Sequence, residues 1–485
     1  MEIKDLEPKN LWANFYALTR VPRPSGHLDA IRQFLMEFAK ENNIEAFVDN
    51  AGNVIYRQSA TPGMEDRPIV TLQGHMDMVP QKSPDSTHNF ETDPIPAYVD
   101  GDWVKTKGTT LGADDGMALA AIMGIMTDHS LKHGPLEALM TVDEETCMYG
   151  VNNLRADTLK GRILLNLDNE NEGEMIIGSA GGVNVTASMK YREVPADPSY
   201  AAIKIALSGL QGGHSGLEIN QGRANANKLL VRIVRDAVAN FEAHLVSWNC
   251  GNMRNAIPNN GIVVLNMPKS SCTDFEKQIK NWKKIFTEEY EGIESNIQLT
   301  SEEIALPEKQ VPEEIQDNLI NAIYACHDGV LRNIPSLPHI VETSSNLAIV
   351  EIDKGKVMAK ILVRSSQDSM RQYNAETVSS VFAMAGLKVE WDGAYPAWQP
   401  NTHSSLVELM KKVYNNLFGT DPVAQVVHAG LECGGIGSLY PGMEMVSIGP
   451  TTRSPHTPGE RTYIPDAEKY YKFIVAILEN LPANK

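Results

Sequence analysis

Four short segments in the first part of the chain combine acidic and imidazole side chains. Imidazole nitrogen and carboxylate oxygen are the atoms that Zn²⁺ and Mn²⁺ bind in proteins. The segments therefore predict a metal centre, provided that the fold brings them together. They are residues 74–77 (Gly-His-Met-Asp), 112–116 (Gly-Ala-Asp-Asp-Gly), 143–145 (Asp-Glu-Glu) and Asp168.

A second histidine is expected to complete such a centre, and His456 is the best candidate. It stands in residues 454–460, Ser-Pro-His-Thr-Pro-Gly-Glu, shortly after an apolar run at 445–448. That run predicts a strand. His456 can therefore face the same edge of a sheet as the four earlier segments.

The elements that would position these side chains follow from short apolar runs. Residues 69–72, 136–142 and 163–167 predict buried strands, and residues 116–126, rich in Ala and Met, predict a buried helix. Strands alternating with helices are typical of an α/β layer with a mostly parallel sheet. Because ligands bind outside the carboxyl ends of the strands in such sheets, we expect the segments to converge there.

Each segment also has a simpler explanation when it is taken alone. Asp114 and Asp115 could cap the helix that follows them, and Glu144 and Glu145 could belong to a solvated face. Adjacent carboxylates that directly follow a buried strand repel each other unless a cation offsets them. The coincidence of all the segments along one edge favours the metal centre.

The chain as a whole predicts one α/β domain, with a mostly parallel sheet flanked by helices, interrupted by an inserted α+β domain. The first domain comprises residues 1–183 and 399–485, and the insertion comprises residues 184–398. A helix is expected at 27–42 with Ser25 as its cap, a hairpin around 49–53, and a connector at 391–400. The remaining expected strands are 203–207, 262–266, 347–352 and 356–363, and the remaining expected helices are 225–243, 273–289, 313–325, 375–385, 404–418 and 467–481.

The composition excludes several classes of protein. Of the 485 residues, 43 are Lys or Arg and 61 are Asp or Glu, a net charge of −18, which argues against a nucleic-acid partner. The five cysteines lie far apart with no C-x-x-C pair, so neither a disulfide framework nor a thiolate zinc site is expected. We find no signal-peptide pattern, and the longest nearly apolar run, 117–126, is about half of the roughly 20 residues that span a membrane. A cytoplasmic protein without a membrane partner is expected.

Taken together, the motifs resemble the M20 family of metallopeptidases and, within it, the aminoacyl-histidine dipeptidase group. The likeness covers essentially the whole chain in order. It implies a zinc-exopeptidase-like catalytic domain, residues 1–183 and 399–485, a lid domain, residues 184–398, and a homodimer. The matching motifs are Gly-His-Met-Asp-Met-Val-Pro at 74–80, Gly-Ala-Asp-Asp-Gly at 112–116, Asp-Glu-Glu-Thr at 143–146, Asn-Leu-Asp at 166–168, Gly-Gly-His-Ser-Gly at 212–216 and Ser-Pro-His-Thr at 454–457.

The resemblance implies two divalent ions that share one carboxylate. One ion would be held by His75, Asp114 and Asp168, and the other by Asp114, Glu145 and His456. Zinc is the expected metal, although N/O sites rich in carboxylates also accept Mn²⁺ or Co²⁺. Such a pair of ions can polarise a scissile carbonyl and activate a water molecule.

The resemblance also assigns two catalytic carboxylates. Asp77 would hydrogen-bond His75 and fix its tautomer. Glu144 would be the general base that takes a proton from the attacking water and delivers it to the leaving amine. The family further implies a cis peptide bond between Asp114 and Asp115.

Four substrate-binding residues are implied in the same way. His214 would reach the oxyanion of the tetrahedral intermediate, Asn255 would contact the substrate, Arg364 would bind the free carboxylate of a dipeptide, and Gly435 would let the backbone approach it. From the residues alone, His214 could be structural in a glycine-rich turn, Arg364 could form a surface salt bridge, and residues 434–435 could be an ordinary turn. Cys147 and Cys433 are interpreted as packing residues.

The sequence thus predicts a hydrolase, a metallo-dipeptidase whose substrates are unblocked dipeptides, including Xaa-His dipeptides such as β-alanyl-histidine. One alternative is an M20 deacylase of N-acyl amino acids, although the long insertion favours the dipeptidase. A second is a non-enzymatic metal-binding protein on the same fold. A serine or cysteine hydrolase is disfavoured, because no G-x-S-x-G nucleophile elbow follows a predicted strand.

Overall fold

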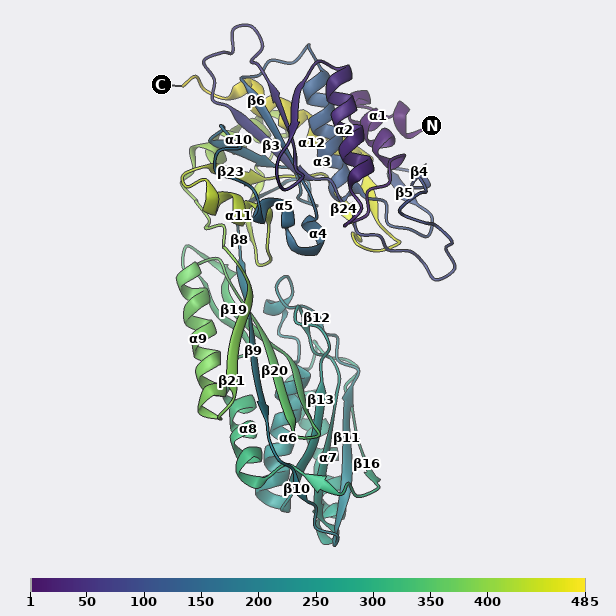
Figure 1. The fold of residues 1–485 in the computed structure, drawn as a ribbon, viewed down its shortest axis with the longest axis vertical. Helices are drawn as coiled ribbons and strands as arrows, with labels where there is room; N and C mark the ends of the chain where they lie inside the picture. Colours follow the sequence, from purple (N-terminus) through teal and green to yellow (C-terminus); the bar gives the residue numbers. More distant parts are fainter. Residues whose placement is uncertain (1, 485) are drawn as a thin grey trace. The chain divides into compact units, whose positions relative to one another are not determined.

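The computed structural model describes residues 2–484, and they form two compact units (Figure 1). The first unit holds the residues up to Ser179, Trp398–Val426 and those from Leu431 on, and the second holds Ala180–Ala397 and Val427–Gly430. The second unit is therefore inserted into the first along the chain. The short segment Val427–Gly430 lies within the range predicted for the first domain but groups with the second unit, where the carbonyl of Val427 accepts a hydrogen bond from the amide of Ala180.

An eight-stranded sheet forms the centre of the first unit. Its four middle strands, β6, β3, β7 and β23, run parallel, whereas β2 and β8, the strands next to them on the two sides, pair antiparallel with them, as β1 does with β2. The α/β fold class is confirmed, and the parallel pairing lies in the middle of the sheet. In spatial order the strands are β1 (Glu45–Val48), β2 (Val54–Gln58), β6 (Leu136–Thr141), β3 (Val70–His75), β7 (Ile163–Asn166), β23 (Glu444–Ser447), β8 (Glu174–Ser179) and β22 (Val423–Val427).

Helices pack around this sheet, and α1 lies against α3 as α10 lies against α12 (Figure 1). Every residue of β3 and β6 is buried, as the apolar runs predicted. The cap expected at Ser25 is wrong: α2 starts at Asp29, and the Ser25 hydroxyl instead donates to Asp77 Oδ2 at 2.8 Å. The helices are α1 (Lys9–Thr19), α2 (Asp29–Glu41), α3 (Ala113–Thr127), α4 (Glu144–Cys147), α5 (Tyr149–Asn152), α10 (Ser405–Phe418), α11 (Glu432–Leu439) and α12 (Ile464–Asn480), with a 3-10 turn at Ile3–Asp5.

A small four-stranded sheet joins the late part of the chain to the early part of the first unit. Strand β25 (Arg461–Tyr463) pairs with β5 (Trp103–Thr106), and this pairing fixes the loop that carries His456. The other two strands of this sheet are β24 (Thr452–Arg453) and β4 (Ala97–Asp100).

The second unit is built on a nine-stranded antiparallel sheet. Helices α6 (Ala226–Phe241), α7 (Lys269–Glu289), α8 (Glu313–Ala325) and α9 (Asp368–Met384) pack on it and share one hydrophobic core with it (Figure 1). The strands are β16 (Gln298–Ile304), β11 (Tyr200–Ser208), β15 (Gly261–Pro268), β13 (His244–Cys250), β19 (Leu337–Asp353), β20 (Lys356–Ser365), β9 (Gly181–Lys190) and β21 (Lys388–Tyr395), and β18 (Gly329–Ile334) pairs with β19.

The expected α+β character of this unit is confirmed, but the connector at 391–400 is wrong in its first half. Strand β21 runs to Tyr395 and pairs with β9, so only the residues after it connect. Two short strand pairs complete the unit, β10 (Val194–Pro195) with β17 (Lys309–Gln310) and β12 (Gly213–His214) with β14 (Ala256–Ile257), together with a 3-10 turn at Ile219–Gln221. Among the described residues, no helix has the length and apolar character needed to span a membrane.

Candidate metal centre

The four predicted segments lie at one edge of the central sheet of the first unit. His75 ends β3, the residues 143–145 follow β6, and Asp168 follows β7. Since β6, β3 and β7 are parallel neighbours, their carboxyl ends share that edge. Asp114 lies in the first turn of α3, which begins at the same edge.

Asp114 lies between two histidines, one on each of its carboxylate oxygens. Its Oδ1 is 2.9 Å from His75 Nε2, and its Oδ2 is 3.0 Å from His456 Nε2. Asp168 Oδ1 is 3.5 Å from His75 Nε2, and Glu145 Oε2 is 3.0 Å from His456 Nε2. The structure thus brings all five predicted ligands together as two groups that share Asp114.

Asp115 is a neighbour of the centre, but its two oxygens are already engaged. Oδ2 accepts the amide of His75 at 3.1 Å, and Oδ1 accepts the amide of Ala118 at 3.3 Å. The bond to Ala118 caps the start of α3. Of the two adjacent aspartates, Asp115 therefore caps the helix and Asp114 does not. The peptide bond between them is cis, as the family resemblance implies.

The donor set fits divalent cations. Glu145 Oε1 is buried and has no hydrogen-bond partner among the described residues. Burial raises the pKa of Asp168 to about 6, and the carboxylates of Asp114 and Glu145 add to the rise. The His456 ring donates hydrogen bonds to the carboxylates of Asp114 and Glu145, and these bonds raise the pKa of His456 to about 11. Buried carboxylates that repel one another are offset by bound cations, and imidazole and carboxylate suit zinc or manganese.

Asp77 links the end of β3 to the start of α4. It is 0% exposed, and its carboxylate accepts the amides of Glu144 at 3.1 Å and Glu145 at 3.3 Å. His75 Nδ1 lies 3.1 Å from the Asp77 carbonyl and 3.5 Å from Oδ1, which leaves Nε2 facing Asp114. Although burial acts to raise it, the pKa of Asp77 is lowered to about 2 by His75 and Ser25. Asp77 therefore orients both a histidine and the turn that carries two glutamates.

Glu144 has the properties of a group that exchanges protons. Its side chain is partly buried, and burial raises its pKa well above the usual value, with Asp168 and Glu432 adding to the rise against the opposing charge of His75. A raised pKa brings a carboxyl group closer to neutral pH, where it can both take and give a proton.

Three buried residues that support the centre were not identified from the sequence. Glu460 is 3% exposed, and its carboxylate accepts the amides of four consecutive residues, 111–114. Glu432 Oε2 accepts from Gln73 Nε2 at 2.6 Å and from Thr141 Oγ1 at 2.7 Å. Arg23 donates to the carbonyls of residues 76, 77 and 112. Glu460 stands in the His456 motif, but nothing in the sequence indicated its partners.

The predicted substrate-binding residues of the second unit have distinct surroundings. His214 Nδ1 accepts the amides of Gly216 at 3.2 Å and Leu217 at 3.0 Å, so the proton of the neutral ring is on Nε2. Burial and the charge of Arg364 lower the pKa of His214 to about 4. Arg364 is 5% exposed, so the surface salt bridge considered for it is wrong. Asn255 is exposed, and its carbonyl accepts the amide of Ser215 at 2.8 Å.

The remaining predictions concern glycine and cysteine residues. Gly435 lies inside α11 rather than in a turn, and a Cβ there would collide with Val151 Cγ1, so the glycine allows α11 to approach α5. Cys433 is buried, as expected for a packing residue, whereas Cys147 is exposed and the packing role given to it is wrong.

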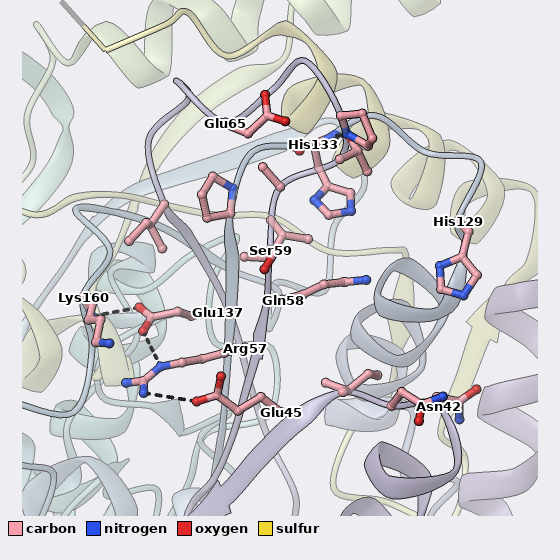
Figure 2. A pocket seen from close by; sticks show the side chains of 18 residues that line it. Asn42, Glu45, Arg57, Gln58, Ser59, Glu65, His129, His133, Glu137 and Lys160 are labelled. Atoms are coloured by element: carbon pink, nitrogen blue, oxygen red, sulfur yellow. Dashed lines mark hydrogen bonds and ion pairs between the residues drawn. The ribbon is translucent and has the colours of Figure 1, made fainter.

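A cavity of about 880 Å³ lies at the opposite ends of β3 and β6 (Figure 2). Leu136, the first residue of β6, lines it, and Arg57 lies there between Glu45 and Glu137. None of the predicted site residues lines this cavity. It is therefore separate from the metal centre.

Comparisons with known proteins agree with this geometry. Residues 71–480 match the peptidase family M20/M25/M40. The chain is 37% identical over 482 residues to the cytosol non-specific dipeptidase of Escherichia coli K12, covering 99% of each chain. The crystal structure of an aminoacylhistidine dipeptidase from Vibrio alginolyticus is similar with a TM-score of 0.93 and 38% identity, over 100% of this chain and 99% of that one. A tripeptidase from Staphylococcus aureus shares the fold, with a TM-score of 0.57 and 14% identity over 98% and 99% of the two chains. The resemblance seen in the motifs is confirmed, and the chain belongs to peptidase family M20/M25/M40.

Proposed function

We propose that the protein is a metal-dependent dipeptidase that hydrolyses unblocked dipeptides, including Xaa-His. The observation that carries the proposal is the position of Asp114, with one histidine nitrogen within 3.0 Å of each of its oxygens. The names of the two full-length relatives, a non-specific dipeptidase and an aminoacylhistidine dipeptidase, support the substrate class.

One ion would be held by His75, Asp114 and Asp168, and the other by Asp114, Glu145 and His456. Two divalent ions, zinc first and Mn²⁺ or Co²⁺ as alternatives, would polarise the scissile carbonyl and lower the pKa of the attacking water. The three carboxylates carry three negative charges, which suits a dication pair.

Proton transfer is assigned to Glu144. Its backbone amide is held by Asp77, so the carboxyl group stays next to the ligand Glu145 without having to bind metal itself. Glu144 takes a proton from water and later donates it to the leaving amine. Asp77 maintains the tautomer of His75 and the position of Glu144.

We assign substrate binding in the second unit, as a lid domain, to three residues. His214 would donate from Nε2 to the oxyanion, because Nδ1 already accepts two amides. Arg364 would bind the terminal carboxylate, and Asn255 would contact the substrate. In the first unit, Gly435 would allow the backbone of the protein to approach the substrate. We further propose that the protein is located in the cytoplasm and forms a homodimer.

The test is hydrolysis by chelator-treated protein to which single metals are restored. The substrates are alanyl-alanine, an Xaa-His dipeptide and N-acetylated amino acids. We expect activity to return with one or more divalent metals and with the unblocked dipeptides. Turnover of N-acetyl amino acids alone would make the protein a deacylase, and metal binding without any hydrolysis would make it a binding protein.

A further inference from the structure

Arg364 carries a buried positive charge that the second unit leaves without an anionic partner. The residue is 5% exposed, and no carboxylate lies within 4.0 Å of it among the described residues. Its only side-chain hydrogen bond there runs from Nη1 to Tyr395 Oη at 2.8 Å, and Nε is buried without a partner. A buried charge of this kind is costly unless a partner compensates it. An anion from outside the chain is therefore expected at this guanidinium.

The groups around Arg364 are neutral, so they do not supply the missing charge. Ser344 pairs with Arg364 across β19 and β20, and its hydroxyl lies 2.7 Å from His428 Nε2. Burial and the charge of Arg364 lower the pKa of His428 to about 3, and His214 is likewise neutral. A Cβ placed on Gly216 would be 3.2 Å from Arg364 Nε and 3.1 Å from His214 Cε1, so this turn packs next to the guanidinium.

Tyr395 reaches Arg364 across a glycine. Gly182 of β9 pairs with Arg364 on one side and with Tyr395 on the other. A Cβ at Gly182 would lie 2.5 Å from both Cζ and Oη of Tyr395, so the phenol ring crosses directly over the glycine. Arg371 donates to the carbonyl of Tyr395 and lies 3.0 Å from Asp368 Oδ1, which fixes the backbone of this tyrosine.

We propose that Tyr395, placed by Gly182, is a positioning residue that orients Arg364 to bind the terminal carboxylate of the substrate. Tyr395 Oη accepts from Nη1, and this leaves the Nε and Nη2 edge of the guanidinium for the carboxylate. That edge presents two parallel N–H groups, which match the two oxygens of a carboxylate. The proposal rests on the proposed function, because it takes the substrate to be a dipeptide with a free carboxyl group.

The test compares alanyl-alanine with its C-terminal amide in the metal-loaded protein. For Tyr395→Phe we expect kcat/KM for alanyl-alanine to fall about tenfold, the size of one lost hydrogen bond to a charged group, mainly through KM. For the amide we expect a change of less than about twofold. In an Arg364→Met background, Tyr395→Phe should add no further loss, because the two residues act as a pair. Tyr191→Phe is the matched control, since the buried Tyr191 hydroxyl has no partner among the described residues.

Two results would overturn the proposal. One is an equal loss for alanyl-alanine and its amide in Tyr395→Phe, and the other is kinetics no different from those of Tyr191→Phe. If Tyr395→Phe does not fold, Gly182→Ala is used in its place, since its methyl group displaces the ring while the hydroxyl remains. It should lower the preference for the acid over the amide in the same way, and an unchanged preference would contradict the proposal.

A binding measurement separates this inference from the proposed function. Titration calorimetry of Glu144→Gln with alanyl-alanine, N-acetyl-alanine and the two corresponding amides measures carboxylate recognition without turnover. We expect the acids to bind more tightly than the amides and Tyr395→Phe to reduce that difference about tenfold. If wild-type protein hydrolyses no dipeptide but this difference is found and Tyr395→Phe reduces it, the proposed function fails, whereas the positioning of Arg364 by Tyr395 for carboxylate binding is supported. If dipeptides are hydrolysed and Tyr395→Phe leaves the difference intact, the inference fails alone.

Discussion

Replacing Glu460 with Gln should loosen the segment that carries Asp114. Oε2 of Glu460 accepts the amides of Leu111 at 2.7 Å and Gly112 at 3.0 Å, and Oε1 accepts those of Ala113 at 2.7 Å and Asp114 at 3.2 Å. A Gln side chain presents an NH₂ group to one of these pairs, so two buried N–H groups lose their acceptor. At about 1–3 kcal/mol for each unsatisfied group, the segment should be destabilised by about 2–6 kcal/mol.

The assay combines urea unfolding with hydrogen–deuterium exchange of a peptide that covers residues 111–116. Both are measured at pH 8, above the pKa of about 7 to which burial raises Glu460. We expect the free energy of unfolding to fall by about 2–6 kcal/mol and the amides of 111–114 to exchange faster in Glu460→Gln.

Glu65→Gln is the control for this experiment, because its carboxylate also accepts a backbone amide, that of Gly63, but is exposed. A surface change of this kind should stay within about 0.5 kcal/mol of wild type. Unfolding and exchange in Glu460→Gln that match those of Glu65→Gln would refute the role given to Glu460.

Three further predictions concern the ligands, the base and one histidine. Glu144→Gln should retain two metals per chain by elemental analysis while kcat for alanyl-alanine falls about 10²–10⁴-fold, and full activity would remove Glu144 from the mechanism. Glu145→Gln should weaken only one metal whereas Asp114→Asn should weaken both, so equal stoichiometries in the two variants would contradict the shared-carboxylate arrangement. His428 has a pKa lowered from 6.5 to about 3 by burial, so unfolding takes up a proton as the pH falls below 6.5. Between pH 7.5 and 5, wild type should therefore lose about 2 kcal/mol of unfolding free energy relative to His428→Asn, and parallel stability curves would show that His428 is not buried as a neutral ring.

The shared edge of the candidate ligands could be predicted because most of them lie close to an apolar run that becomes a buried element, whereas His456 lies in a loop between β24 and β25. His75 is the last residue of β3, and Asp168 follows β7. The short apolar runs that predict these two buried strands were therefore enough to place both residues at one edge of the sheet. Asp114 and Asp115 were harder to separate, since adjacent aspartates at a helix start can cap or ligate. Only the bonds of Asp115 to the amides of His75 and Ala118 distinguish the two.

The supporting residues could not be predicted, because their partners are backbone atoms remote in sequence. Glu460 binds amides that precede it by almost 350 positions, and no residue type in the segment 111–114 signals an acceptor. Serine is a common helix-capping residue, but the Ser25 hydroxyl donates to Asp77 instead. Which of the two hydrogen bonds Ser25 makes depends on the tertiary structure, and the local sequence does not show it. Strand β21 was interpreted in part as a connector because it is an edge strand with mostly exposed side chains, and its apolar alternation is correspondingly weak.

The position of β23 has a consequence for how the chain folds during synthesis. This strand is Glu444–Ser447, yet it lies between β7 and β8, which end at Asn166 and Ser179. When the last strand of the second unit, β21, has been synthesised, the strand that lies between β7 and β8 has not yet been made. The central sheet therefore cannot be complete before β23 is made, and His456 and Glu460 follow β23 in the chain. All strands of the nine-stranded sheet are thus synthesised before the first sheet or the set of candidate metal ligands is complete.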